Sequence, residues 1–172
     1  MGSKLIIIRG NSGSGKTTIA KSLQEKFGYN TMLISQDIVR RDILKVKDGT
    51  DTKALPLLKD LLRYGACNSN VVILEGILYS DWYLSLFQVA LEVFGENVFA
   101  YYYDISFDET LQRHQTKPNK NDFGEEAMRR WWRENDYIGI IKEKILLSNM
   151  DINSTVEMIT NDVNQNLRRK KL

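Results

Sequence analysis

A run of residues near the N-terminus has the types and spacing of a phosphate-binding site. Residues 10–17 read GNSGSGKT, a full match to the pattern G-x-x-x-x-G-K-[ST]. Glycines allow positive φ and a close approach of the backbone to a polyphosphate, and a helix N-terminus favours negative charge. In this pattern the lysine reaches the β- and γ-phosphates, and the threonine hydroxyl binds Mg²⁺. The run therefore predicts a site for a nucleoside triphosphate.

The residues on either side of this run supply the elements that must position it. Leu5 to Ile8 form a short apolar run, typical of a strand buried on both faces. Apolar residues between Ile19 and Phe27 fall on one helical face, and Gly28 offers a helix stop. The predicted ligands of ATP are Gly10, Asn11, Ser12, Gly13, Ser14, Gly15, Lys16, Thr17 and Thr18.

The composition is that of a single globular domain, residues 1–172, with no repeat or low-complexity linker. Apolar residues make up 42% and charged residues 27%, and the net charge of +2 does not require a nucleic-acid partner. One cysteine, Cys67, excludes an internal disulfide and a cysteine-based zinc site. No signal peptide or membrane-spanning run is recognisable. We expect a cytoplasmic protein with no membrane partner, either a monomer or a homodimer.

Short apolar runs alternate with helical patterns along the chain, which predicts a parallel sheet with helices on both faces. Ligands of such sheets bind beyond the carboxyl ends of the strands. After the first strand, the expected strands are Thr31 to Ser35, Asn70 to Leu74, Val98 to Tyr103 and Lys144 to Leu147. The expected helices are Asp37 to Val46, Lys53 to Tyr64, Ser80 to Phe94, Glu125 to Glu134, and two that open with capping boxes at Ser106 and Ser154.

Asp37 follows the second expected strand and would face the phosphate loop. A carboxylate there can accept the proton of a substrate hydroxyl that attacks the γ-phosphorus, or bind Mg²⁺. Arg40 or Arg41, one turn later, can hold an anionic acceptor or the transferring phosphoryl group. The alternative is that Asp37 only starts a helix, as acids often do, and that both arginines are solvated.

Glu75 ends the third expected strand, after four apolar residues. A carboxylate beside a phosphate loop usually orients Mg²⁺ or its waters, so Thr17 and Glu75 are the predicted metal ligands. The alternative is an acidic residue in a turn.

Arginines surround the polar segment that precedes the last expected strand. Arg113 comes before it, and Arg129 and Arg133 follow it at a spacing of i, i+4, which would place both on one helix face. A lid at about residues 115–135 that brings such arginines over the nucleotide would stabilise charge on the transferring phosphoryl group. The alternatives are an exposed charged helix whose tryptophans pack on the core, or a single-stranded nucleic-acid site, which we consider the weaker of the two.

Two further matches resemble the guanine-binding motifs of GTPases. Residues 119–122 read NKND, and residues 136–139 read DYIG. In GTPases the D-x-x-G motif precedes N-K-x-D and follows the third strand, whereas here the order is reversed. We interpret both matches as coincidence.

Together, the phosphate loop, Asp37 and the arginine-bearing segment resemble the P-loop kinase family, which includes gluconate, shikimate and uridine kinases, polynucleotide kinase, chloramphenicol phosphotransferase and the zeta toxins. The resemblance implies a three-layer α/β fold with a five-stranded parallel sheet in the order 2-3-1-4-5. It also implies ATP, Mg²⁺ and phosphoryl transfer to a hydroxyl of a small acceptor, such as a nucleoside, a metabolite, an antibiotic or a polynucleotide 5′ end.

By the same resemblance, Asp37 matches the acceptor-hydroxyl base, and Arg40 or Arg41 matches the arginine of a D-x-x-R pattern. Lys16, Asp37, Arg40, Arg113, Arg129 and Arg133 are thus the predicted catalytic residues. The chain lacks the long, recognisable nucleotide-monophosphate lid of adenylate kinase, which argues against a nucleotide monophosphate as the acceptor. The competing hypothesis is a nucleotide-binding regulatory ATPase without a small-molecule acceptor.

Overall fold

The computed structural model describes residues 2–116 and 124–169 and contains one five-stranded sheet. All its strand pairs are parallel, in the order β2-β3-β1-β4-β5, which confirms the predicted order. The strands are β1 (Lys4–Gly10), β2 (Thr31–Ser35), β3 (Val71–Gly76), β4 (Val98–Tyr103) and β5 (Glu143–Leu146).

The central strand β1 explains why the sheet is buried on both faces. It pairs with β3 on one side and β4 on the other, so that Ile6 lies opposite both Ile73 and Phe99. Successive side chains of a strand point to opposite faces. Leu5 and Ile7 accordingly join one hydrophobic core, and Ile6 and Ile8 join the other. A continuous apolar run is therefore the correct pattern for this strand.

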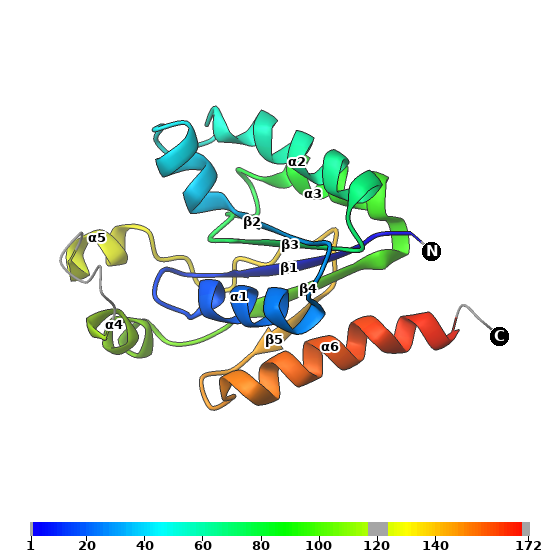
Figure 1. The fold of residues 1–172 in the computed structure, drawn as a ribbon. Coiled ribbons are helices and arrows are strands. Elements are labelled where there is room, and N and C mark those ends of the chain that lie inside the picture. Colours follow the sequence, from blue (N-terminus) through cyan, green and yellow to red (C-terminus); the bar gives the residue numbers. More distant parts are fainter. Residues whose placement is uncertain (1, 117–123, 170–172) are drawn as a thin grey trace.

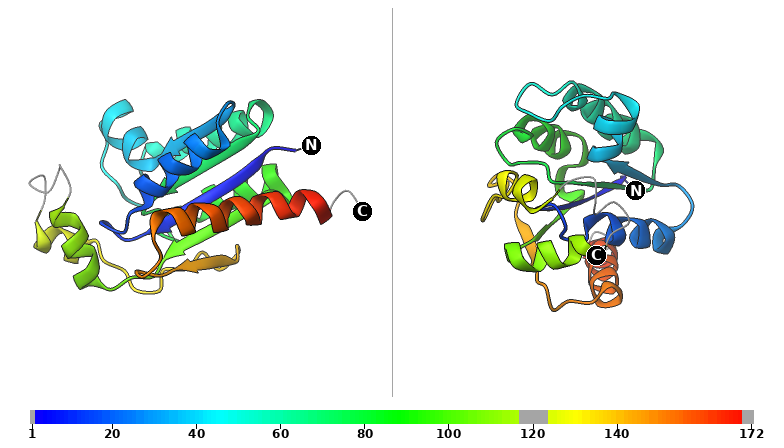
Figure 2. Two further views of the ribbon diagram at one scale, coloured as in Figure 1. Left: turned by 60° about the horizontal axis from the view of Figure 1, so that its bottom comes forward. Right: turned by 90° about the vertical axis from the view of Figure 1, so that its left-hand side faces the viewer.

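Helices cover both faces of the sheet (Figure 1). One face carries α1 (Lys16–Phe27) and α6 (Ile152–Arg169), and the other carries α2 (Ala54–Asn68) and α3 (Leu84–Phe94), which leads through a short 3₁₀ turn, η2 (Gly95–Asn97), into β4. Two further helices, α4 (Phe107–Gln115) and α5 (Glu125–Arg130), project beyond the end of the sheet where the loop after β1 lies, opposite the two termini (Figure 2). The three-layer prediction is confirmed.

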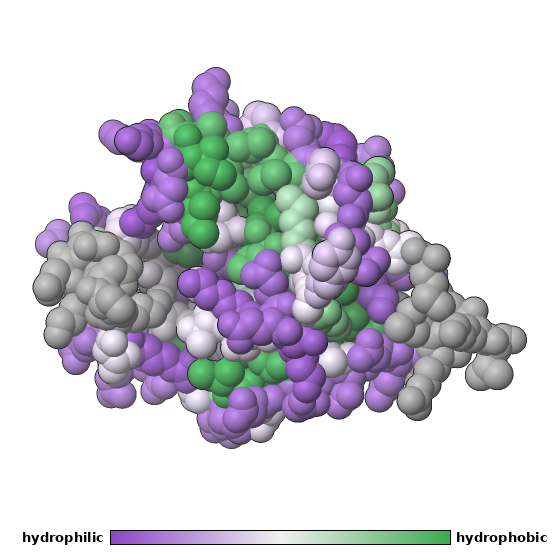
Figure 3. Space-filling model, viewed as in Figure 1, coloured by the Kyte–Doolittle hydropathy of each residue, from purple (hydrophilic) through white to green (hydrophobic). Residues whose placement is uncertain are grey.

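The segment after β2 differs from its prediction. Instead of an α-helix from Asp37 to Val46, a π-helical segment, η1 (Ile38–Ile43), is followed by an irregular loop. The amide of Leu44 donates to the carbonyl of Val39, five residues earlier, at 3.1 Å. β-Branched residues have low helix propensity, and the apolar pattern used for the prediction is not a buried face: Ile38 and Ile43 are 48% and 59% exposed. Figure 3 shows apolar side chains gathered over η1 and α2.

Tertiary hydrogen bonds shorten two predicted helices. The helix expected from Ser80 begins at Leu84, because the amide and hydroxyl of Ser80 both donate to the carboxylate of Asp136, at 3.0 and 2.7 Å. The helix expected to reach Glu134 ends at Arg130. The predicted capping box at Ser154 is also wrong, because Asp151 caps α6 by accepting a hydrogen bond from the Ser154 amide at 2.9 Å.

The capping box at Ser106 is confirmed in its first half, since the Glu109 amide donates to the Ser106 hydroxyl at 3.3 Å. Within residues 2–116 and 124–169, no helix is both long and apolar enough to cross a membrane.

Candidate active site

The phosphate loop joins β1 to α1 at the carboxyl edge of the sheet. Gly13 and Gly15 have φ values of 87° and 103°, a region that glycine adopts without strain. A Cβ atom on Gly13 would lie 2.6 Å from the carbonyl oxygen of Thr110 in α4, whereas one on Gly15 would meet nothing closer than the Arg113 guanidinium, at 3.9 Å. The glycine at position 13 is thus required by packing as well as by φ, while the space beside Gly15 is left for a ligand.

Lys16 is held across this loop. Its Nζ donates to the carbonyl of Asn11 at 2.8 Å and to the hydroxyl of Ser14 at 3.2 Å. The side chain is buried but lines the cavity described below. The ammonium group is therefore positioned at the mouth of the loop, where the phosphates of a nucleotide would bind.

Glu75 connects the phosphate loop with β2. One carboxylate oxygen accepts a hydrogen bond from the Thr17 hydroxyl at 3.2 Å, and the other accepts one from the Ser35 hydroxyl at 2.5 Å. The side chain is 3% exposed, and Ser35 lies opposite Glu75 in the β2–β3 register. Hydroxyl and carboxylate oxygens are the ligands that Mg²⁺ prefers, so Thr17 and Glu75 fit the predicted metal site. Ser35 is a partner that the sequence did not reveal.

Asp37 forms ion pairs with both nearby arginines. Its Oδ1 lies 2.7 Å from Arg40 Nη2 and 3.4 Å from Arg41 Nε. The Asp37 carboxylate is about half exposed, whereas the Arg40 side chain is only 15% exposed. The Nε–H of Arg40 is buried and has no hydrogen-bond partner among the described residues.

A cavity of about 480 Å³ brings the loop and these side chains together. The two predicted metal ligands line it together with Asp37, Arg40 and Arg41, and so do several residues that the sequence did not indicate. The lining residues are Ser12, Gly13, Lys16, Thr17, Asp37, Arg40, Arg41, Lys47, Asp48, Glu75, Gly76, Ile77, Tyr79, Trp82 and Trp131.

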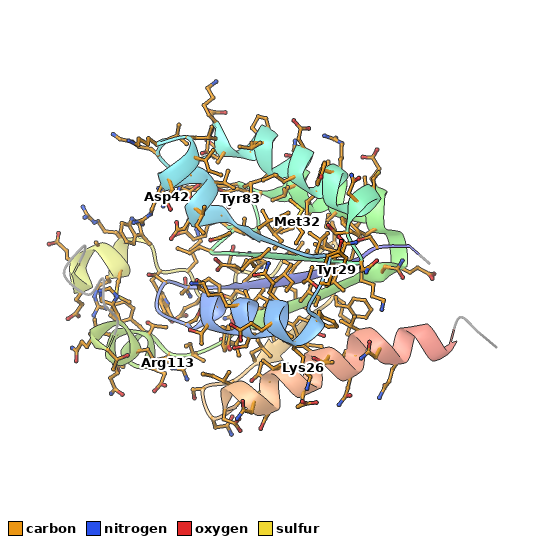
Figure 4. All side chains as sticks on the ribbon, viewed as in Figure 1. Lys26, Tyr29, Met32, Asp42, Tyr83 and Arg113 are labelled. Carbon is orange, nitrogen blue, oxygen red and sulfur yellow. The ribbon has the colours of Figure 1, made fainter. Side chains whose placement is uncertain are left out.

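Of the three predicted lid arginines, Arg113 contacts the phosphate loop. Its Nη1 donates to the Ser14 carbonyl at 3.0 Å, and Nε forms an ion pair with Glu109 at 2.7 Å. Figure 4 shows Arg113 on α4, on the side of the sheet that carries α1. This guanidinium is close enough to the loop to take part in nucleotide binding.

Arg129 and Arg133 do not share a helix face, contrary to the prediction, because α5 ends at Arg130. Arg129 pairs with Glu125 at 2.9 Å and lies 4.3 Å from the centre of the Phe107 ring. Arg133 pairs with Asp81 at 2.5 Å, and its guanidinium lies 4.0 Å from the centre of the Tyr79 ring. Neither side chain lines the cavity.

Asn11 connects the phosphate loop to the segment after α5. Its Nδ2 donates to the Arg133 carbonyl at 2.8 Å, and its Oδ1 accepts a hydrogen bond from the Arg133 amide at 3.1 Å. Asn11 is buried. The sequence predicts that Asn11 binds the nucleotide. In the structure its side chain instead forms both of these hydrogen bonds with the backbone of Arg133.

Arg9 is a fully buried cation that sequence reasoning missed. It forms ion pairs with Asp136 at 2.7 Å and Glu143 at 3.0 Å, and donates twice to the Leu78 carbonyl, at 3.0 and 2.8 Å. The Cζ atom of Arg9 lies 5.3 Å from the centre of the Phe87 ring and 5.5 Å from the centre of the Tyr102 ring. This cluster fixes the start of the phosphate loop to the segments before α3 and around β5. Its sequence signal is a lone arginine at the end of an apolar run.

Asp48, in the loop after η1, lines the cavity together with Asp37 and Glu75, and the sequence did not reveal it. Its Oδ2 accepts a hydrogen bond from Gln36 at 2.9 Å, and its Oδ1 accepts one from the Tyr83 hydroxyl at 2.6 Å. Burial, with the Asp48 contact adding to it, raises the pKa of Tyr83 well above its usual range, so the phenol remains a donor.

Of the two GTPase-like matches, the structure describes only residues 136–139. Asp136 is the partner of Arg9. Residues 119–122 and the centre of the proposed lid lie outside the described residues. Among residues 2–116 and 124–169, no three histidine, cysteine or acidic side chains cluster in a way that could hold a metal ion.

A five-stranded parallel sheet in the order 2-3-1-4-5, with a phosphate loop after its central strand, defines a P-loop kinase-like protein. A family model described as an AAA domain matches residues 5–135, more than half of the chain, and the chain therefore belongs to this AAA-domain family. A search of curated protein sequences finds no match.

Three solved structures illustrate the likeness. A gluconokinase from Sinorhizobium meliloti 1021 is 15% identical, with 98% of each chain covered and a TM-score of 0.66. The tunicamycin resistance protein of Deinococcus radiodurans is 16% identical, with 94% of this chain and 96% of that chain covered and a TM-score of 0.65. The APS kinase of Mycobacterium tuberculosis is 16% identical, with 95% and 98% covered and a TM-score of 0.64. At these identities the likeness establishes the fold.

Proposed function

We propose that this protein is an ATP-dependent kinase that transfers a phosphoryl group to a hydroxyl of a small acceptor. The observation that carries the proposal is that one cavity is lined both by the phosphate loop, with Lys16 and Thr17, and by Asp37 with its two arginines. A triphosphate site and a candidate base therefore share one enclosed space. The kinase names among the structural neighbours support the same class of reaction.

The donor half of the site would hold the nucleotide. Lys16 and the loop amides would bind the β- and γ-phosphates, while Thr17 and Glu75 would hold Mg²⁺. When bound, ATP supplies the γ-phosphoryl group and Mg²⁺ offsets the charge of the phosphates. Arg113, already bonded to the Ser14 carbonyl, would add a cation beside the loop.

The acceptor half would activate the hydroxyl. Asp37 would accept its proton as the hydroxyl oxygen forms a bond to the γ-phosphorus and the bond to the β,γ-bridging oxygen breaks, leaving ADP. Arg40 and Arg41, which pair with Asp37, would orient its carboxylate and attract an anionic acceptor.

Acceptor-dependent release of ADP tests the proposal. We expect ATP turnover to rise when a pool of nucleosides, sugars, aminoglycosides and 5′-hydroxyl oligonucleotides is added. Asp37→Asn should lower the acceptor-dependent kcat by about 10²–10⁴-fold, with ATP affinity unchanged.

Asp42→Asn is the matched control, because Asp42 is an exposed acid of the same η1 segment and does not line the cavity (Figure 4). Full phosphotransfer by Asp37→Asn would contradict the assignment of the base. Hydrolysis of ATP that no acceptor stimulates would favour a regulatory ATPase.

A further inference from the structure

The far wall of the cavity is aromatic. Tyr79 and Trp82, from the connection between β3 and α3, meet edge to face with ring centres 4.8 Å apart at 84°. The Tyr79 hydroxyl donates to the Trp131 carbonyl at 2.6 Å, which ties the third aromatic residue to the first two. Trp82 and Trp131 are half-buried, and both residues line the cavity. Such a wall binds a flat or apolar ring.

The aromatic wall is fixed by contacts that do not involve a ligand. Burial raises the pKa of Tyr79 to about 12, so its hydroxyl remains a donor to the Trp131 carbonyl. The Arg133 guanidinium lies 4.0 Å from the centre of the Tyr79 ring and 5.1 Å from that of Trp82, and it pairs with Asp81. The wall is therefore a preformed surface rather than a set of mobile side chains.

The wall near η1 is polar and charged. Arg40, Arg41 and Lys47 line the cavity there, and the buried Nε–H of Arg40 has no hydrogen-bond partner within the described part of the chain. A second anionic partner besides Asp37 would complete the hydrogen bonds of this guanidinium. Against these three cations the same part of the chain offers two carboxylates, Asp37 and Asp48, and the remaining positive charge favours an anionic group on the ligand.

Asp48 adds a hydrogen-bond acceptor between these two walls. Gln36 and Tyr83, both buried, hold its two carboxylate oxygens in place. These two neutral donors fix the orientation of the carboxylate, whose oxygens can accept further hydrogen bonds from a hydroxyl or a ring N–H group. Polar groups of this kind in a mostly apolar site usually decide which ligand is bound.

We propose that the acceptor is a nucleoside-like molecule with an anionic substituent: its ring packs on Trp82 and Trp131, its donor groups reach Asp48, and its anion lies at Arg40 and Arg41. The proposal rests on the kinase function above and names the acceptor class for it. The γ-phosphoryl group of ATP would be transferred to a free hydroxyl of that molecule, with ADP as the other product.

Four probes separate the ring from the anion. Uridine 3′-monophosphate carries both, uridine carries only the ring, gluconate only the anion and ribose neither. We expect kcat/KM, measured as ADP release, to be highest for uridine 3′-monophosphate and at least about tenfold lower for uridine and for gluconate, with ribose lowest. Dissociation constants of the same four probes, from quenching of tryptophan fluorescence, should follow the same order.

A pair of tryptophan variants tests the aromatic wall. Trp82→Leu should lower kcat/KM for the two uridine compounds by about tenfold and leave that for gluconate within about twofold. Trp132→Leu is the matched control, since Trp132 packs on Phe107, with ring centres 5.3 Å apart, and does not line the cavity. It should leave the order of the four probes unchanged.

The outcomes separate this inference from the kinase proposal. Faster turnover with gluconate or ribose than with uridine 3′-monophosphate would overturn the acceptor class and leave the kinase function intact. Preferential binding of uridine 3′-monophosphate without any ADP release would support the ligand class and contradict the kinase function. If that compound neither binds more tightly nor reacts faster than gluconate, the inference is wrong.

Discussion

The two halves of the cavity are built in different ways. Most of the donor half is a run of consecutive residues, from Gly10 to Thr17, that follows one strand and enters one helix, and Glu75 and Arg113 join it from β3 and α4. The acceptor half is assembled from three distant segments: residues 37–48, residues 76–82 and Trp131. In the proposed function the donor half would bind a common ligand with loop amides, Lys16 and Thr17, whereas the acceptor half would bind with side chains from separate segments. This difference explains why the first half matches a local sequence pattern and the second does not.

The comparison has a consequence for mutations. A change in the donor half should affect every acceptor alike, because each reaction uses the same triphosphate. A change in the acceptor half should alter the order of acceptors, because each acceptor contacts a different set of side chains. The first prediction below tests the donor half, and the other two test contacts that hold the segments of the two halves in place, in order of decreasing effect.

Lys16→Ala should have the largest effect. Loss of the ammonium group at the phosphate loop should lower kcat/KM by about 10²–10³-fold for every acceptor that is used. Steady-state ADP release and equilibrium ATP binding measure the effect, with Lys21→Ala, an exposed lysine of α1, as the control. Wild-type ATP affinity and turnover in Lys16→Ala would contradict the donor site itself.

Asn11→Ala should have an intermediate effect, because this residue belongs to the donor half but bonds to the segment that bears the aromatic wall. Removing its two hydrogen bonds leaves the amide and carbonyl of Arg133 without those partners, which should lower the free energy of unfolding by about 1–3 kcal/mol. Urea unfolding measures the change.

Asn68→Ala provides the control for that variant. Its exposed amide makes one hydrogen bond, to the Tyr64 carbonyl, and its loss should cost no more than about 0.5 kcal/mol. Equal destabilisation by the two variants would show that the Asn11 connection has no special role.

Asp81→Asn should have the smallest effect. Desolvation alone would raise the pKa of Asp81, but hydrogen bonds from Arg133 and the Trp82 amide lower it overall. The pKa of Asp81 is thus lower in the folded protein than in the unfolded chain, where it is about 3.9. The ionised carboxylate therefore stabilises the fold at pH values above the unfolded pKa, and this contribution is lost as the pH falls through the folded pKa. Because the Asp81–Arg133 pair is partly exposed, its removal should lower the free energy of unfolding at pH 7 by no more than about 1 kcal/mol.

The measurement is the difference in Tm between the wild type and Asp81→Asn as a function of pH. The wild type should be slightly more stable at pH 7, and the difference should shrink toward pH 3. A difference that grows as the pH falls would contradict the assigned direction of the pKa shift.

The sheet was predictable because its signals are local. Continuous apolar runs fixed the strands, and the alternation of strands with helices implied parallel pairing, which the register of β1 with β3 and β4 confirms. Helix ends were less predictable, because tertiary contacts decided them. Ser80 donates a hydrogen bond to Asp136 instead of starting a helix. After Arg130, the backbone of Trp131 and Arg133 forms hydrogen bonds with Tyr79 and Asn11 instead of continuing the helix.

The candidate site divides in the same manner. Lys16, Thr17 and Glu75 lie together as their positions at strand ends implied, and Asp37 lines the same cavity. The prediction that Arg129 and Arg133 share a helix face is wrong, because α5 ends at Arg130 and Arg133 lies beyond it. That Asp48 and Trp82 line the same cavity could not be predicted, since no local pattern relates a residue in a polar loop to one in the connection after β3.

The buried ion cluster around Arg9 restricts how this sequence can diverge. Loss of the arginine alone would leave the carboxylates of Asp136 and Glu143 without the cation they share, and loss of one acid would leave a buried cation short of a partner. Breaking one partner of such a cluster is typically destabilising by about 3–5 kcal/mol, whereas exchange of the whole set for apolar residues is often neutral. Arg9, Asp136 and Glu143 are therefore expected to covary, although more than 120 positions separate the first from the other two.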